Sequence, residues 1–127
     1  MSQYRILRNA DTGSVLLNRV KWCQSYWCRF RGLMLRRDLP EDEGLLFIYG
    51  RESRVDTSIH MLFMFFPIAT VWLDSNGRVV DKVLAKPWRP AYASRKPAQY
   101  FIEARPSLLD RVQIDDRLQW DVPSPAI

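Results

Sequence analysis

The chain has 127 residues and a net charge of +5, and 47% of its residues are hydrophobic. Its length matches one compact domain over residues 1–127, and the lack of internal repeats and low-complexity stretches argues against a solenoid or a disordered linker. The charge favours an anionic partner, but basic and acidic residues are mixed and no RNP-like, zinc-finger or helix-turn-helix pattern accompanies them, which argues against nucleic acid.

The N-terminus predicts no export of the chain. It has neither the apolar region nor the cleavage site of a secretory signal. The longest apolar run, residues 59–73, contains Pro67 and falls short of the roughly 20 residues that a spanning helix needs. We therefore expect a soluble, cytoplasmic protein without a membrane span.

A hairpin and a helix are predicted at the start of the chain. Residues 4–7 and 15–20 flank a turn-forming Asn-Ala-Asp-Thr-Gly stretch and are typical of paired strands. Ser25 is a candidate N-cap for a following helix, because apolar residues recur around it at helical spacing. These residues are Cys23, Trp27, Phe30 and Met34. Gly32 indicates the end of this helix or a close approach of another segment.

Cys23 and Cys28 are spaced too widely for a zinc knuckle, and a single histidine cannot complete a usual zinc site with them. Placed on one helix, they would lie about 7.5 Å apart along the axis, beyond disulfide reach. We therefore expect two reduced packing cysteines. A disulfide requires the helix to begin after Cys23.

Short strands are predicted over most of the remaining chain. They span residues 44–49, 58–65, 68–74, 78–84, 99–104 and 117–122. Asn76-Gly77 predicts a type I′ hairpin turn, residues 86–98 an extended loop with three prolines, and residues 106–111 a short helix. The expected fold is mostly β: an antiparallel sandwich or jelly-roll-like fold, or a partly open barrel, with one or two short helices.

The only histidine, His60, lies in the apolar run SIHMLFMFFP. Strand alternation puts Ser58, His60, Leu62 and Met64 on one face and predicts that Ile59, Met61, Phe63 and Phe65 face the core. His60 is then either a half-buried histidine with one hydrogen-bond partner or a residue that binds a ligand in a cleft. No local signature selects a catalytic triad, and no spacing of acidic residues and histidine predicts a metal centre or cofactor.

Two further groups of residues have a binding interpretation and a structural one. Arginines 29, 31, 36 and 37 surround the predicted helix end, where guanidinium groups suit a carboxylate or phosphate but also suit a solvated helix C-terminus. Trp88 and Arg89 lie between prolines in the long loop. They are either a stiffened binding hot spot or a cap on the open end of the sheet.

The segments FRGLMLRRDLPEDEGLLFIY, SIHMLFMFFPIATVWLDSNGRVVDKVLAKPWRP and QYFIEA resemble the domain-of-unknown-function family 192 of bacteria and archaea from about residue 31 to 120. The resemblance implies a single small, mostly β domain without an established activity. The matching positions are Arg31, Gly32, Leu33, Met34, Arg36 or Arg37, His60, Met61, Met64, Pro67, Ile68, Asp74 and Gly77.

We interpret the chain as a non-enzymatic domain that binds a small anionic or peptide-like ligand in a cleft. The predicted cleft residues are His60, Arg31, Trp88 and Arg89, with Ser58 and Met64 beside the histidine. One alternative is a hydrolase-like enzyme with His60 as general base, which requires a nucleophile or carboxylate near its ring. Another is a macromolecular interaction module with a basic surface.

Overall fold

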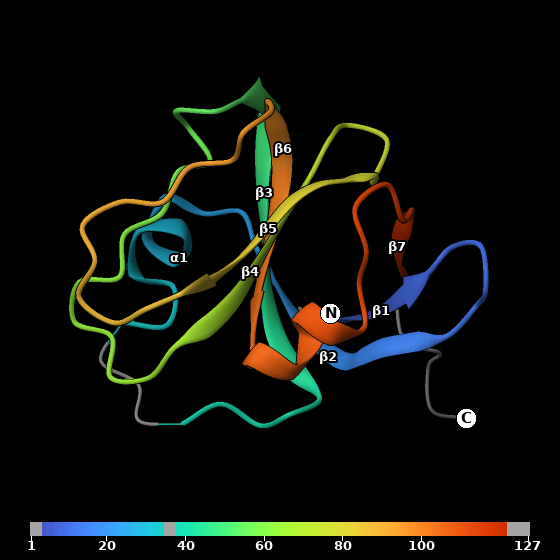
Figure 1. Cartoon of the computed structure of the whole chain (residues 1–127), viewed down its shortest axis with the longest axis horizontal. Helices are drawn as coiled ribbons and strands as arrows, with labels where there is room; N and C mark the ends of the chain where they lie inside the picture. The colour runs from blue at the N-terminus through green and yellow to red at the C-terminus, as the bar shows by residue number, and fades with distance from the viewer. Residues whose placement is uncertain (1–3, 35–37, 122–127) are drawn as a thin grey trace.

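A computed structural model of the chain describes residues 4–34 and 38–121, with the backbone alone for Tyr26, Phe30 and Arg31 (Figure 1). Seven strands, one α-helix and one 3-10 helix follow each other along the chain. They are β1 Tyr4–Asn9, β2 Val15–Cys23, α1 Tyr26–Arg31, β3 Glu43–Ser53, β4 Ile68–Leu73, β5 Val79–Ala85, β6 Ala98–Ala104, η1 Pro106–Asp110 and β7 Leu118–Asp121.

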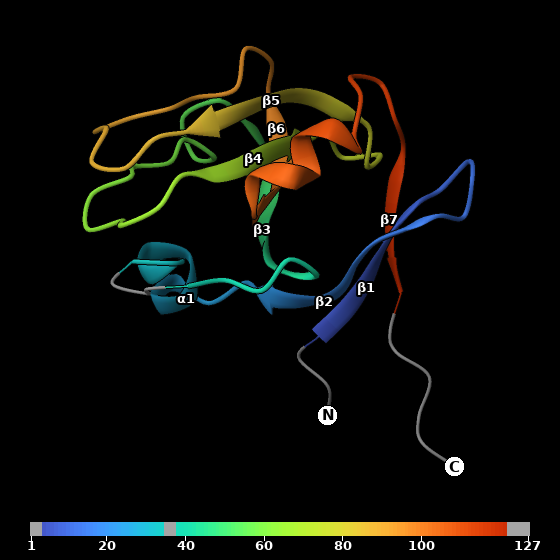
Figure 2. The ribbon, with the colours of Figure 1, turned by 60° about the horizontal axis from the view of Figure 1, so that its bottom comes forward.

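All seven strands form one sheet in the order β5-β4-β6-β3-β2-β1-β7. Neighbours are antiparallel except β2 and β3, which run parallel, and α1 lies in the connection between them. The sheet is strongly curled (Figure 2). Its two ends meet in part, because Val79 donates a backbone hydrogen bond to Asp116 and Leu118 donates one to Gly77. The fold is therefore mostly β, and the partly open barrel is the alternative it matches.

Apolar side chains pack on both faces of the sheet. Leu46 on β3, Ile102 on β6 and Val71 on β4 belong to a first core, which η1 helps to cover through Leu108. The adjacent residues of the same strands, Phe47, Phe101 and Trp72, belong to a second core. That second core also contains Leu33, just after α1, and the buried residues Ile59, Met61 and Met64 of the segment before β4.

The hairpin of β1 and β2 and the short helix from Pro106 are confirmed. Asn76 and Gly77 do join β4 to β5, but of the two only Gly77 has a positive φ. Gly77 N–H donates to the Asp74 carbonyl at 3.0 Å. The connection is thus a turn followed by one left-handed glycine, and the predicted type I′ turn is wrong.

Residues 58–65 do not form the predicted strand. The segment makes one isolated bridge, Ile59 with Tyr92, and then continues as turns. Its alternation breaks after Met61: Met64 is buried, whereas Phe63 and Phe65 are exposed. A run rich in aromatic residues suits a strand locally, but the loop that contains Pro87 and Pro90 offers it few backbone partners.

The helix also differs from its predicted form. Ser25 is the N-cap, with its side chain accepting a hydrogen bond from the Cys28 N–H at 3.2 Å, and Gly32 is the C-cap with a φ of 49°. The proposed apolar stripe is wrong, because Cys23 ends β2 and Trp27 is 74% exposed. Cys23 and Cys28 form a disulfide, which corrects the expectation of reduced cysteines. The helix begins after Cys23, which is the condition on which that pairing depended.

Candidate functional site

Three neighbouring strands place an acidic side chain inside the second core. Glu103 on β6 pairs with Leu45 on β3 and with Thr70 on β4, so the three side chains lie in a row on one face of the sheet. Glu103 is only 6% exposed, and no hydrogen bond or ion pair joins its carboxyl to another described residue. Thr70 Oγ1 is buried and likewise has no partner in the described part of the chain. Buried polar groups without partners are costly and mark a candidate site.

Glu103 lies at the edge of a pocket of ≈50 Å³, which we call the Glu103 pit. Aromatic rings from β3 and β6 form one wall. Phe47 stacks on Phe101 with 4.3 Å between ring centroids, and Tyr49 stacks on the same Phe101 ring at 5.9 Å. The volume holds a few water molecules or a carboxylate-sized group, whereas pockets for whole drug-sized ligands measure about 300–1,000 Å³. Only one end of a larger ligand can enter.

The second wall comes from α1 and the residues after it. Arg29, Gly32, Leu33 and Met34 line the pit. A Cβ built on Gly32 would lie 3.4 Å from Glu103 Oε1, so the glycine allows the chain to pass close to the carboxyl. Because the Cys23–Cys28 disulfide ties α1 to the end of β2, this wall is covalently fastened to the sheet.

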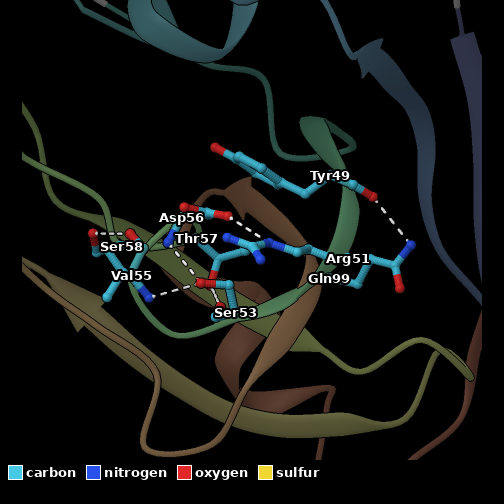
Figure 3. Close-up of polar contacts among 8 residues, drawn as sticks. All are labelled: Tyr49, Arg51, Ser53, Val55, Asp56, Thr57, Ser58 and Gln99. Carbon is cyan, nitrogen blue, oxygen red and sulfur yellow. Dashed lines mark hydrogen bonds and ion pairs between the residues drawn. The ribbon is translucent and has the colours of Figure 1, made fainter.

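The third wall is the segment Ser58, Ile59, His60 and Met64. A compact turn after β3 positions its start (Figure 3). Ser53 Oγ accepts hydrogen bonds from the backbone N–H groups of residues 55 and 56, and Ser58 Oγ donates to the Val55 carbonyl at 2.6 Å. Trp72 Nε1 donates to the Thr57 carbonyl at 2.8 Å, which anchors this turn to β4.

The electrostatics of the pit follow from burial. Burial raises the pKa of Glu103 from 4.5 to about 8, so its carboxyl is mostly protonated at neutral pH. Burial also raises the pKa of Tyr49, while the Arg29 guanidinium opposes that rise and the Glu103 carboxylate adds to it. Arg29 lies over the Tyr49 ring, 4.6 Å from its centroid. At neutral pH the pit therefore has a neutral acid and a permanent cation in its lining.

His60 also lines the pit, and its Nδ1 accepts a hydrogen bond from the Leu62 N–H at 3.2 Å. A nitrogen that accepts carries no proton, so a neutral ring holds its proton on Nε2. In this tautomer the other ring nitrogen is a hydrogen-bond donor.

The structure unites some of the predicted site residues and separates others. His60, Ser58 and Met64 share the pit. Trp88 and Arg89 do not line it, although their loop is bonded to the same segment through Met61. The side chain of Arg31 lies outside the described residues, as do Arg36 and Arg37 entirely.

Sequence reasoning missed Glu103, Tyr49 and Arg29 as one group. The available signal for Glu103 was a single acid inside the apolar strand segment YFIEA. A charged residue in such a strand is almost never fully buried unless it has a partner, so it is a candidate site by itself. Glu103 lies close to Tyr49 because β3 pairs with β6, and close to Arg29 because α1 packs beside these strands. Neither contact can be predicted from local sequence patterns.

In residues 4–34 and 38–121, no three His, Cys, Asp or Glu side chains form a group that could hold a metal ion. Within the same residues, no helix has the length and hydropathy needed to cross a membrane.

Similar proteins share this fold. The UPF0127 proteins of Thermococcus kodakarensis and Pyrococcus furiosus are 39% and 34% identical to the chain, covering 88% and 89% of it and 71% and 96% of their own lengths. A solved structure from Sinorhizobium meliloti, named as a candidate transcription regulator, has a TM-score of 0.80 and 26% identity, with 94% of each chain covered.

A second solved structure is a Novosphingobium aromaticivorans protein of unknown function, with a TM-score of 0.77 and 18% identity. The match covers 92% of this chain and 84% of that protein, and it supports the fold alone. The model of the family DUF192, described as "Uncharacterized ACR", matches residues 7–120. The chain therefore belongs to the DUF192 family.

Proposed function

We propose that the chain is a small-ligand-binding domain whose Glu103 pit receives a carboxylate or a peptide-like carbonyl group. The observation that carries this proposal is the buried Glu103 carboxyl, which has no hydrogen-bond partner among the described residues. With a pKa of about 8 it is a hydrogen-bond donor at neutral pH, as a protonated acid in an apolar site can be.

The charges around the pit favour an acceptor ligand over a cation. Arg29 lines the pit as a permanent cation, and Glu103 is the only acid among its described lining residues. A cationic ligand would have to ionise Glu103 and also approach Arg29. A carboxylate or carbonyl oxygen can accept from the protonated acid and interact favourably with the guanidinium. The aromatic wall of Phe47 and Phe101 would then contact the carbon skeleton beside that group.

Acetate and methylammonium are matched probes for this proposal, each titrated into the ¹⁵N-labelled full chain by NMR. Acetate is expected to shift the backbone resonances of Gly32 and His60. Its affinity should be about tenfold lower at pH 9 than at pH 7, because the acid that donates to it ionises near pH 8. Tighter methylammonium binding at the higher pH, or no shift with either probe, would contradict the proposal.

Two variants at one position sharpen the test. Glu103→Gln keeps a donor of similar size, so acetate binding should persist and lose its dependence on pH. Glu103→Leu removes the donor and should abolish binding while the fold, checked by circular dichroism, is retained. A folded Glu103→Gln variant that fails to bind acetate would contradict the proposal, because a hydrogen-bond donor of similar size at this position would then not be enough for binding.

General acid–base catalysis is a second candidate, because a carboxyl with a pKa of about 8 is well placed to transfer protons near neutral pH. In that case Glu103, and not His60, is the acid–base group. Glu103→Gln distinguishes the two candidates, since it should keep ligand binding but lose turnover of any ester or amide that the parent chain hydrolyses.

A further inference from the structure

An apolar patch is formed by side chains that do not line the Glu103 pit, on the segment before β4 and the loop after β5. We call it the loop-tip patch, and its residues are Leu62, Phe63, Phe65 and Trp88. They are 39%, 47%, 56% and 51% exposed, respectively. Both views place the loop before β4 and the loop after β5 at the same end of the molecule, beyond the ends of these strands (Figures 1 and 2). If three half-exposed rings each present about half of the 150–250 Å² that such a ring can bury, they offer about 300 Å².

Backbone contacts hold the loop-tip patch in place. Trp88 N–H donates to the Met61 carbonyl at 2.7 Å, and Met61 N–H donates to the Arg89 carbonyl at 2.8 Å. The rings also touch each other: Phe63 and Phe65 meet Trp88 edge to face, with centroid distances of 5.3 and 6.2 Å. The loop-tip patch is therefore held in one conformation by these contacts.

The backbone of the loop-tip patch is strained. Three non-glycine residues in the described chain have positive φ, and two of them are Phe63 at 63° and Trp88 at 68°. Bulky side chains rarely adopt this region, and such outliers persist only where the surrounding structure imposes them. The fold thus keeps two large rings exposed although both their exposure and their backbone conformation are unfavourable. A contact made by these rings would offset that cost.

The two segments that form the loop-tip patch contain basic but no acidic residues, and Asp38, which lies near Phe66 and Pro67, is paired with Arg105 at 3.3 Å. Residues 86–97 contain four exposed cations and no acid, and residues 57–67 also contain no acid. The cations are Lys86, Arg89, Arg95 and Lys96. Arg95 pairs with Asp81 at 3.1 Å, and no ion pair engages the other three within the described residues. Lys86 and Arg89, the exposed cations that flank Trp88 in the sequence, favour a partner that is anionic as well as apolar.

We propose that the loop-tip patch docks the chain onto the surface of a bilayer that contains anionic lipid, an interaction separate from the Glu103 pit. Phe63, Phe65 and Trp88 would enter the headgroup region, where aromatic residues are favoured, and Lys86 and Arg89 would meet lipid phosphates. Single-stranded nucleic acid fits less well, because base stacking needs open ring faces along a basic groove, and these rings pack on each other. A second copy would bring like charges together.

Co-sedimentation of the full chain with vesicles tests this inference. Binding is expected to phosphatidylcholine vesicles that contain about 30% phosphatidylglycerol, and at least tenfold weaker binding to pure phosphatidylcholine. The triple variant Phe63→Ser, Phe65→Ser, Trp88→Ser should bind the anionic vesicles at least tenfold less. The double variant Lys86→Glu, Arg89→Glu should show a loss of similar size.

Matched controls come from the opposite end of β5. Ile114 is also exposed, and the neighbouring Asp115 is bonded to Val79 at the start of that strand. Ile114→Ser and Arg117→Glu should leave vesicle binding unchanged, and unfolding curves should show that every variant folds. The inference is overturned if the chain does not bind anionic vesicles. It is also overturned if binding survives the aromatic triple variant, or if a mixed-sequence single-stranded oligonucleotide competes the vesicles off.

Discussion

Replacing Glu103 by glutamine should change how the stability of the protein depends on pH. Burial raises the pKa of Glu103 to about 8 in the folded chain, whereas the unfolded chain has the ordinary value of 4.5. Between these values the folded state holds a proton that the unfolded state has lost. The contribution of this group to stability is therefore complete below pH 4.5, declines as the pH rises and reaches its minimum above pH 8. Glutamine has a similar size and no such proton.

The size of the effect follows from the shift. One pKa unit corresponds to about 1.4 kcal/mol, so the rise of the Glu103 pKa from 4.5 to about 8 amounts to about 5 kcal/mol over the whole range. Relative to Glu103→Gln, the parent chain should lose about 1.4 kcal/mol per pH unit between pH 5 and pH 8. The buried amide adds an offset, but that offset does not depend on pH.

The assay is urea unfolding of both proteins at several pH values, without reductant, so that the Cys23–Cys28 disulfide stays closed. The quantity of interest is the difference in unfolding free energy between parent and variant at each pH. A difference that is flat from pH 5 to pH 8 would refute the buried neutral acid. A difference that is flat over this range and falls as the pH drops below about 4.5 would mean that Glu103 is ionised and paired in the folded state.

Three other changes test how α1 is held. Gly32→Ala should cost about 1–3 kcal/mol in unfolding free energy, because φ is 49° there and an alanine in this conformation is strained even though its methyl group would only touch Glu103 and Phe47. A loss below 0.5 kcal/mol, within the range of an ordinary surface substitution, would show that the backbone relaxes freely. Ser25→Ala removes the N-cap and should cost about 1 kcal/mol, checked by urea unfolding beside Ser25→Asp, which keeps a cap. Cys23→Ser with Cys28→Ser opens a six-residue loop and should cost about 2 kcal/mol by loop entropy; no change in melting temperature would contradict this estimate.

Local chemistry made the regular parts of the fold predictable. The opening hairpin, the N-cap at Ser25 and the end of the helix at Gly32 each depend on residues close together in the sequence. The apolar run 44–49 likewise forms the core of β3. The segment 58–65 was mispredicted because its residue types suit a strand, whereas tertiary contacts with residues 88–92 decide its path.

The site was predictable only in part, for a related reason. His60, Ser58 and Met64 are neighbours in sequence, so one local pattern found all three. Glu103 and Arg29 enter the same pit from distant segments, and a parallel pairing of β2 with β3 is required to bring α1 over β6. The cysteines show the same limit: helical spacing argued against a disulfide unless the helix began after Cys23, and the strand-to-helix corner in the structure permits it.

The pairing of β1 with β7 sets the order in which the chain can finish folding. β1 is synthesised well before its outer partner β7, and the Arg8–Asp121 ion pair of 2.6 Å between them spans 113 residues. Contacts this distant in sequence form late and slow the closure of the sheet. Until β7 pairs with it, the outer edge of β1 has unpaired backbone N–H and C=O groups, which can pair with a strand of another chain. A nascent or C-terminally clipped chain is thus the form of this protein most exposed to aggregation.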